Sequence, residues 1–178
     1  MEGALRRRGR VMTLSVRRLT PDDYDALRAL RLESLRLYPE CFAADPDQED
    51  AMTKEEWLSR LSTAVSFGGY VDGVLSGMVV FSRPSRPKLA HTGDVGAMYV
   101  RDAARGTGLA DALMTALIDH ASENVEQIQL TVNAENSRAI KFYERHGFRP
   151  IGRIPRSLHV GDRYYDDLLM LRAVSTSD

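Results

Sequence analysis

The spacing of hydrophobic positions changes several times along the chain, and each change marks a new element. Apolar and polar residues alternate in short stretches, as in half-buried strands, and apolar residues recur every three or four positions in longer stretches, as in amphipathic helices. The alternating stretches predict strands at 14–18, 64–71, 74–82, 91–100, 128–132, 148–159 and 163–171. The helical spacing predicts helices at 20–38, 53–61, 109–121 and 136–146.

Residues at the predicted ends of these helices support the assignment. Thr20 followed by Pro21 favours a helix start, and Thr53 with Glu56 forms the pattern of a capping box. Gly147 follows the last predicted helix in the position that commonly ends one. Residues 39–52 are polar and predict a loop. The predicted order is therefore β-α-α-β-β-β-α-β-α-β-β, a single mixed α/β domain over residues 12–174.

Length and composition narrow the class of protein. The chain has 178 residues, enough for one domain with its own core, and 24 basic against 25 acidic residues argue against a basic nucleic-acid binder. No apolar run approaches the roughly 18 residues of a membrane span. One cysteine and four scattered histidines indicate neither a disulfide nor a metal site. We therefore expect a cytoplasmic protein without membrane, nucleic-acid or metal partners, and a homodimer is one possible assembly.

The first residues differ in charge from the rest. Residues 1–12 carry four arginines against one glutamate and show no apolar periodicity. We expect residues 1–11 to be a disordered or artefactual extension, with a nucleic-acid-binding tail as the alternative.

The most informative stretch lies at residues 98–110, where a strand, a glycine-containing loop and a helix follow one another. Backbone N–H groups at a helix start form a cradle for anions, and glycines let a phosphate approach the backbone. The loop fails the Walker A pattern because Leu109 and Ala110 follow Gly108. It also fails the dinucleotide pattern, because Asp111 occupies the position of the third glycine.

Two segments together resemble the GNAT superfamily of N-acetyltransferases. Residues 105–110 (RGTGLA) fit its R/Q-x-x-G-x-G/A signature, and residues 130–148 (LTVNAENSRAIKFYERHGF) look like its strand–Asn–Ala–Tyr–Gly–Phe segment. The resemblance covers residues 91–150 closely, and the predicted element order agrees with the family's fold. It implies a GNAT-like acyl-CoA N-acyltransferase fold and an acetyl-CoA-dependent enzyme that acetylates a primary amine of a small molecule or protein by direct attack.

The resemblance also implies an acetyl-CoA site. In this family the strand before the glycine loop splays from its parallel neighbour, the pantetheine arm fills the gap, and the pyrophosphate binds the loop. Matched by position, the implied cofactor-binding residues are Met98, Tyr99, Val100, Arg105, Gly106, Thr107, Gly108, Leu109, Ala110, Asn136, Ala139 and Tyr143.

Two residues are candidates for catalysis. By resemblance, Tyr143 points at the thioester sulfur, and a phenol can supply the proton that a leaving thiolate needs. Asp94 is the candidate base, because it lies four residues before Met98, on the same face of the predicted strand. Alternatives remain: Tyr143 as a core residue, Asp94 as a strand-end charge, and Asn136 as a helix cap as well as a cofactor contact.

The sequence indicates the acceptor substrate less clearly than it indicates the cofactor. Glu33 lies on the helix where this family builds part of the acceptor pocket, although a solvated glutamate is the alternative. Residues 37–56 hold seven acidic residues against one lysine, which would suit a cationic amine if this segment roofs the site. A solvated acidic loop is equally compatible. A non-catalytic CoA-binding regulatory module with the same fold is the alternative function.

Overall fold

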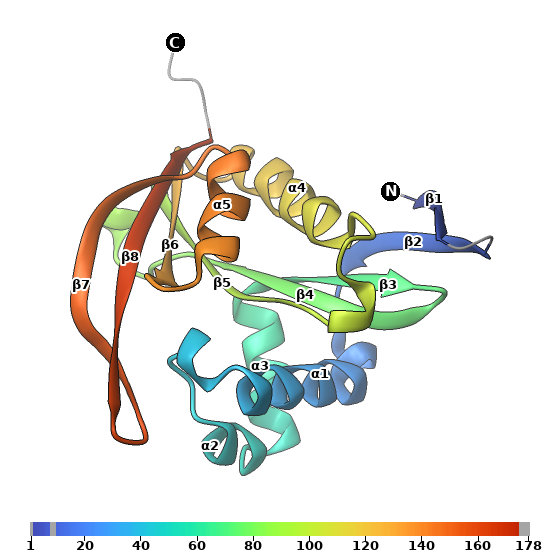
Figure 1. Cartoon of the computed structure of the whole chain (residues 1–178), viewed down its shortest axis with the longest axis horizontal. Helices are drawn as coiled ribbons and strands as arrows, with labels where there is room; N and C mark the ends of the chain where they lie inside the picture. Colours follow the sequence, from blue (N-terminus) through green and yellow to red (C-terminus); the bar gives the residue numbers. More distant parts are fainter. Residues whose placement is uncertain (1, 8–9, 175–178) are drawn as a thin grey trace.

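The computed structural model describes the backbone of residues 2–7 and 10–174, with side chains from Met12 onward (Figure 1). One eight-stranded sheet has the order β1-β2-β3-β4-β5-β6-β8-β7, and every neighbouring pair is antiparallel except β5 and β6. The strands are β1 Glu2–Arg7, β2 Arg10–Arg18, β3 Val65–Val71, β4 Val74–Ser82, β5 Thr92–Val100, β6 Gln127–Asn133, β7 Arg149–Val160 and β8 Arg163–Ala173.

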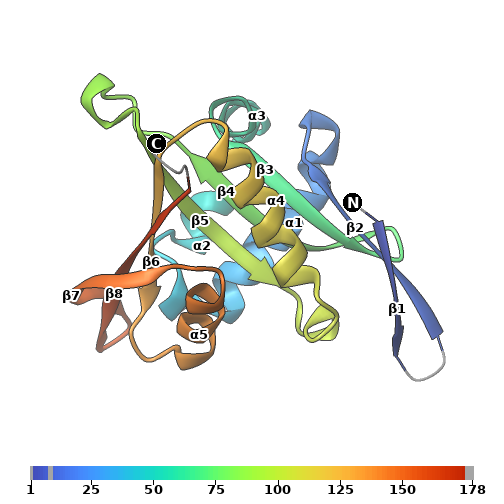
Figure 2. The same cartoon turned by 90° about the horizontal axis from the view of Figure 1, so that it is seen from above.

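Helices cover both faces of the sheet. One face carries α4 (Leu109–Ser122) and α5 (Ser137–Arg145), and the other carries α1 (Tyr24–Leu37), α2 (Pro46–Asp50) and α3 (Lys54–Thr63), as Figures 1 and 2 show. None of the described helices is long and apolar enough to cross a lipid bilayer. The mixed α/β architecture predicted from the sequence is confirmed.

Each face of the sheet has its own apolar cluster. On the α4 face, Leu109, Leu113 and Leu117 are completely buried against the central strands. On the opposite face, Leu30 of α1 and Trp57 of α3 are buried in a second cluster. The central strands are thus fixed from both sides, which holds the backbone of β5 in place near the candidate site.

Two elements were not predicted. Residues 39–52, expected to be a loop, contain the short helix α2, which begins at Pro46 after Asp45 accepts hydrogen bonds from the N–H groups of Asp47 and Gln48. Residues 2–7, expected to be disordered, form strand β1 at the edge of the sheet, paired with β2. Of the remainder of the predicted extension, residues 10–11 begin β2, and residues 1 and 8–9 lie outside the described residues.

Candidate active site

The sheet opens between its two parallel strands. β5 and β6 pair only where Thr92–Asp94 lies beside Gln127–Gln129. Beyond this point the two strands separate. Val95–Val100 has no described strand partner on its β6 side, and Leu130–Asn133 keeps only its pairing with β8. The sequence places a strand, loop and helix on each side of this opening, so that α4 and α5 begin near it (Figure 2).

A bulge in β5 changes which side chains face the opening. Val80 pairs with Gly96 and Met78 with Tyr99, so that β5 has one residue more than β4 in between. Ala97 takes up the extra residue with a φ of 50°, in the left-handed region. As a result Asp94 and Tyr99 share one face of the sheet, and Met98 packs on the other.

Two cavities meet at the opening. The larger, of about 710 Å³, lies along the glycine loop and α5, and the smaller, of about 370 Å³, lies between α1, the β5 bulge and β6. Both volumes lie in the range of ligand sites, about 300–1,000 Å³. The residues that line both cavities are Cys41, Phe42, Met98, Asn133, Asn136, Ala139 and Tyr143.

The glycine loop lines the larger cavity. Gly106 and Gly108 have φ angles of 75° and 88°, and a Cβ atom at either would meet nothing within 4 Å. Their N–H groups donate to no group of the described chain. Arg105 and Ala110 also line the cavity, so the loop offers free N–H donors and a positive charge beside the start of α4.

The other predicted cofactor residues differ in whether their side chains reach the larger cavity. Val100 and Tyr99 both line the larger cavity, but the Tyr99 side chain is buried in the apolar cluster on the α1 face of the sheet. Thr107 and Leu109 are buried in the interior and line neither cavity, so only their backbone could face a ligand there.

Tyr143 is the buried tyrosine between the two cavities. Its ring is fixed by edge contacts with Phe142 and Phe148, at centroid distances of 5.4 and 5.8 Å. Its hydroxyl has no hydrogen-bond partner among the described residues. Burial, and to a smaller degree the electrostatic influence of Cys41, raises the pKa of Tyr143 above its usual value. The phenol therefore stays protonated at neutral pH and faces the junction with a free O–H group.

Asn136 caps α5 and also faces both cavities. Its side-chain oxygen accepts the Ala139 N–H at 3.0 Å, so the predicted cap is confirmed. Its amide nitrogen lies 3.7 Å from the Cys41 sulfur. Burial, and next the charge of Glu40, raises the pKa of Cys41, which disfavours the thiolate needed for a nucleophile.

The candidate base and the candidate acceptor contact, Asp94 and Glu33, also lie outside both cavities. Asp94 accepts a hydrogen bond from Gln129 at 2.8 Å and lines neither cavity. The argument that Asp94 shares a face with Met98 is wrong, because strict alternation along the strand does not allow for the bulge at Ala97. The structure therefore does not bring Asp94 to the site, and its role as a base stays a prediction.

Glu33 is held in an ion pair and also lines neither cavity. Its carboxylate accepts hydrogen bonds from Arg101 at 2.8 Å and from the Tyr99 hydroxyl at 2.9 Å. Burial alone would raise the pKa of Glu33, but these two donors outweigh it and hold the pKa below its usual range. The contacts join α1 to the end of β5, while the predicted contact with an acceptor remains untested.

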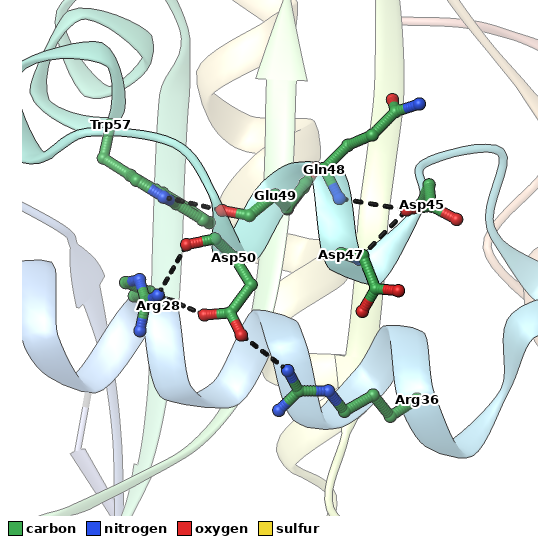
Figure 3. Close-up of polar contacts among 8 residues, drawn as sticks. All are labelled: Arg28, Arg36, Asp45, Asp47, Gln48, Glu49, Asp50 and Trp57. Atoms are coloured by element: carbon green, nitrogen blue, oxygen red, sulfur yellow. Dashed lines mark hydrogen bonds and ion pairs between the residues drawn. The ribbon is translucent and has the colours of Figure 1, made fainter.

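Most of the acidic segment before α3 faces away from the cavities. Asp50 is paired with Arg28 and Arg36 of α1, and Asp45 caps α2, as Figure 3 shows. Of the seven acidic residues at 37–56, only Glu40 lines a cavity. The structure therefore does not support a negative roof over an acceptor.

Several basic residues at the site were missed by sequence reasoning. Arg138, Arg145 and Arg163 line the larger cavity together with Arg105. The first two lie on α5 within the recognised segment, and their spacing of seven residues could have indicated a shared helix face. Arg163 lies on β8, and it reaches the larger cavity only because β8 pairs with β6. Among the described residues, no three His, Cys, Asp or Glu side chains stand close enough to share a metal ion.

Comparison with known proteins gives a consistent result. A family model described as "Acetyltransferase (GNAT) family" matches residues 27–148. The chain is 27% identical over 162 residues to the L-amino acid N-acetyltransferase AaaT of Escherichia coli (strain K12), a match that covers 88% of this chain and 96% of that protein.

Solved structures share the fold. An acetyltransferase of the GNAT family from Streptococcus pneumoniae is 25% identical, with a TM-score of 0.80 and coverage of 90% of this chain and 99% of that one. The Salmonella typhimurium protein yncA, solved with its cofactor acetyl-CoA, is 19% identical, with a TM-score of 0.78 and coverage of 93% and 96%. Because the family model spans more than half of the chain, and the splayed strands and glycine loop agree with it, the protein belongs to the GNAT family of acetyltransferases.

Proposed function

We propose that the protein transfers an acetyl group from acetyl-CoA to a primary amine by direct attack. The observation that carries the proposal is the position of Tyr143, whose free hydroxyl stands where the two cavities meet. Two joined cavities suit two substrates that must react with each other, because binding in adjacent sites holds the reacting groups close.

The larger cavity fits the chemistry of acetyl-CoA. Its phosphates are anions, and the cavity offers free N–H groups at Gly106 and Gly108 and an arginine at each of four positions: Arg105, Arg138, Arg145 and Arg163. The unpaired edge of β5 could hydrogen-bond the amide groups of pantetheine. When bound, acetyl-CoA supplies a thioester carbonyl that an amine can attack and a thiolate that can leave.

The residues at the junction of the two cavities would donate a proton to the leaving sulfur and stabilise negative charge on the carbonyl oxygen. Tyr143, with its raised pKa, holds a proton at its hydroxyl and can donate it as negative charge develops on sulfur. The backbone N–H groups of Met98 or Tyr99, beside the bulge, can stabilise negative charge on a carbonyl oxygen. For the base, the sequence offers Asp94, but no contact with the cavities supports it, and none of the described residues that line the smaller cavity carries a carboxylate.

The acceptor is a small molecule or a protein amino group. The Escherichia coli relative is an L-amino acid N-acetyltransferase, which favours a small amine. A non-catalytic CoA-binding module is the alternative, but such a module would have no use for a proton donor at the junction.

A thiol-release assay with acetyl-CoA tests the proposal. The purified protein is mixed with acetyl-CoA and with amino acids, polyamines, aminoglycosides or peptides, and free CoA is measured with a thiol reagent. We expect release that depends on one class of amine. Binding of acetyl-CoA without any amine-dependent release would support the CoA-binding module instead.

A further inference from the structure

Three acidic residues line the larger cavity, and they differ in whether a basic residue neutralises them. They are Glu40, Asp111 and Glu135. Asp111 is paired with Arg145 at 3.6 Å, and Glu135 accepts hydrogen bonds from Arg163 at 2.8 and 2.9 Å. Glu40 is half-buried and has no ion-pair partner among the described residues. Within the described lining of this cavity, Glu40 is thus the one carboxylate free to act on a bound molecule.

Backbone contacts fix Glu40 beside the opening of the sheet. It lies in the 3₁₀ turn Pro39–Cys41, directly after α1. The side-chain amide of Asn133, at the end of β6, donates to the Glu40 carbonyl at 3.0 Å. The Cys41 N–H donates to the Tyr38 carbonyl, also at 3.0 Å. The turn is therefore held against a strand that borders the opening, as a group that must act at one place requires.

The Glu40 carboxylate lies next to the junction of the two cavities. One of its oxygens is 3.8 Å from the Cys41 sulfur, and that sulfur is 3.7 Å from the amide nitrogen of Asn136. Cys41, Asn136 and Tyr143 each line both cavities. Cys41 is also close enough to Tyr143 to influence the pKa of its hydroxyl. The carboxylate and the phenol therefore both stand beside Cys41, although they come from different elements.

We propose that Glu40 is the general base of the reaction, the group that takes a proton from the attacking amine. This inference rests on the proposed transfer to an amine. An amine that attacks a carbonyl group becomes acidic as its new bond forms, and a carboxylate within reach can then accept the proton. Asp94 and Glu33 line neither cavity, and the other two carboxylates of the larger cavity are paired with arginines.

The proton balance gives Glu40 and Tyr143 separate steps. The ammonium form of the acceptor first loses one proton to water. As the neutral amine forms the C–N bond, Glu40 takes a second proton from its nitrogen. Tyr143 protonates the sulfur, which keeps the electron pair of the broken C–S bond. Water then carries the proton from Glu40 to the Tyr143 phenolate, so that one proton is released to the solvent for each acetyl group transferred.

Glu40→Gln tests this role, because it removes the charge and keeps the size of the side chain. The acceptor is the amine that the wild-type protein acetylates fastest in the thiol-release assay. We expect kcat to fall by about 10²- to 10⁴-fold, the usual scale for a positioned base. The melting temperature should change little and the Kd for acetyl-CoA should not rise, because the only hydrogen-bond partner of the side chain among the described residues is the Cys41 thiol.

Asp47→Asn is the matched control. Asp47 belongs to the same acidic segment, is exposed and lines neither cavity. Its carboxylate has no hydrogen-bond or ion-pair partner among the described residues, and in Figure 3 no dashed line reaches it. Loss of this charge should leave kcat at the wild-type value, which would show that the effect at Glu40 is not a general effect of charge.

Chemical rescue separates a base from a structural residue. Glu40→Ala removes the carboxylate and leaves space for a small anion. Added formate, a free carboxylate, should raise kcat of this variant in proportion to its concentration, whereas chloride at the same ionic strength should not. Glu40→Asp, which keeps a carboxylate on a shorter side chain, should retain part of the activity without formate.

The outcomes separate this inference from the proposed function. If the wild-type protein acetylates an amine and Glu40→Gln has the same kcat, the role of Glu40 is overturned and acetyl transfer stands. A loss confined to KM would also overturn it, because Glu40 would then bind the ammonium group only. So would a loss in Glu40→Ala that formate does not reverse. If the wild-type protein binds acetyl-CoA but acetylates no amine, the proposed function fails and this inference fails with it.

Discussion

At the scale of single residues, the structure distinguishes two tyrosine hydroxyls. Tyr143 has a free hydroxyl at the junction of the cavities, whereas Tyr70 donates its hydroxyl to Asp23 at 3.1 Å and lines neither cavity. The same substitution, tyrosine to phenylalanine, should therefore affect activity in one case and stability in the other.

Tyr143→Phe should lower kcat by about 10²- to 10⁴-fold, the usual scale for a positioned acid. Its melting temperature and acetyl-CoA Kd should change little, because no hydrogen bond within the described chain is lost. Tyr70→Phe, the control, should instead lower stability by about 1 kcal/mol with kcat unchanged. An unchanged kcat in Tyr143→Phe would refute the acid role.

Asp23 should make stability depend on pH. It accepts hydrogen bonds from Arg17 at 2.6 and 2.8 Å and from the Thr20 N–H at 2.9 Å, and the Arg17 contact in particular holds its pKa below the usual range. A lowered pKa in the folded state stabilises the fold above about pH 4, the ordinary carboxyl value, and this stabilisation is lost as the pH falls further.

Asp23→Asn should therefore cost about 1–3 kcal/mol at pH 7, and the difference from the wild type should shrink below about pH 4. Urea unfolding at pH 7 and pH 3 measures both values. Asp22→Asn is the control, since Asp22 is exposed and has no hydrogen-bond or ion-pair partner among the described residues. A difference for Asp23→Asn that stays constant with pH would contradict this assignment.

At the scale of elements, the glycine loop before α4 can be tested against a similar glycine elsewhere. Gly108 and Gly73 have φ angles of 88° and 79°, and an added Cβ would meet nothing within 4 Å at either. Gly73 lies in the turn between β3 and β4 and lines neither cavity. A larger residue should therefore cause similar backbone strain at both positions.

Gly108→Glu should abolish stabilisation by acetyl-CoA, because it places a carboxylate where the phosphates would bind. Gly73→Glu should keep it. At about 100 times the Kd, the wild-type gain is roughly 2.7 kcal/mol, or about 5–10 °C in melting temperature for a chain of this size. Thermal unfolding with and without acetyl-CoA measures the shift, and an equal shift in both variants would exclude the loop from the phosphate site.

Local sequence signals predicted most elements but not every side-chain direction. The strands on either side of Asp72-Gly73 were placed within one residue, because alternation and turn residues agree there. The bulge at Ala97 was missed because it depends on pairing with β4, which no local pattern records. Asp94 was assigned to the wrong face for that reason.

At the scale of the whole molecule, the edge of the sheet formed by β1 is remote from the site in sheet order. Three strands, β2, β3 and β4, stand between β1 and β5. The pairing of β2 with β3 runs from Leu14 to Arg18, so it involves none of the first eleven residues. The stability of the sheet around β5 should therefore not depend on β1.

Deletion of residues 1–11 should leave the acetyl-CoA Kd and kcat unchanged. The melting temperature should fall by no more than a few degrees, because β1 pairs with β2 alone and the deletion exposes only one short edge. Calorimetry, thermal unfolding and size-exclusion chromatography of the full and shortened chains test this. A large loss of melting temperature, or a change in oligomeric state, would instead make β1 part of the stable fold or of an interface. The arginine-rich segment would then have a structural role that its charge alone did not predict.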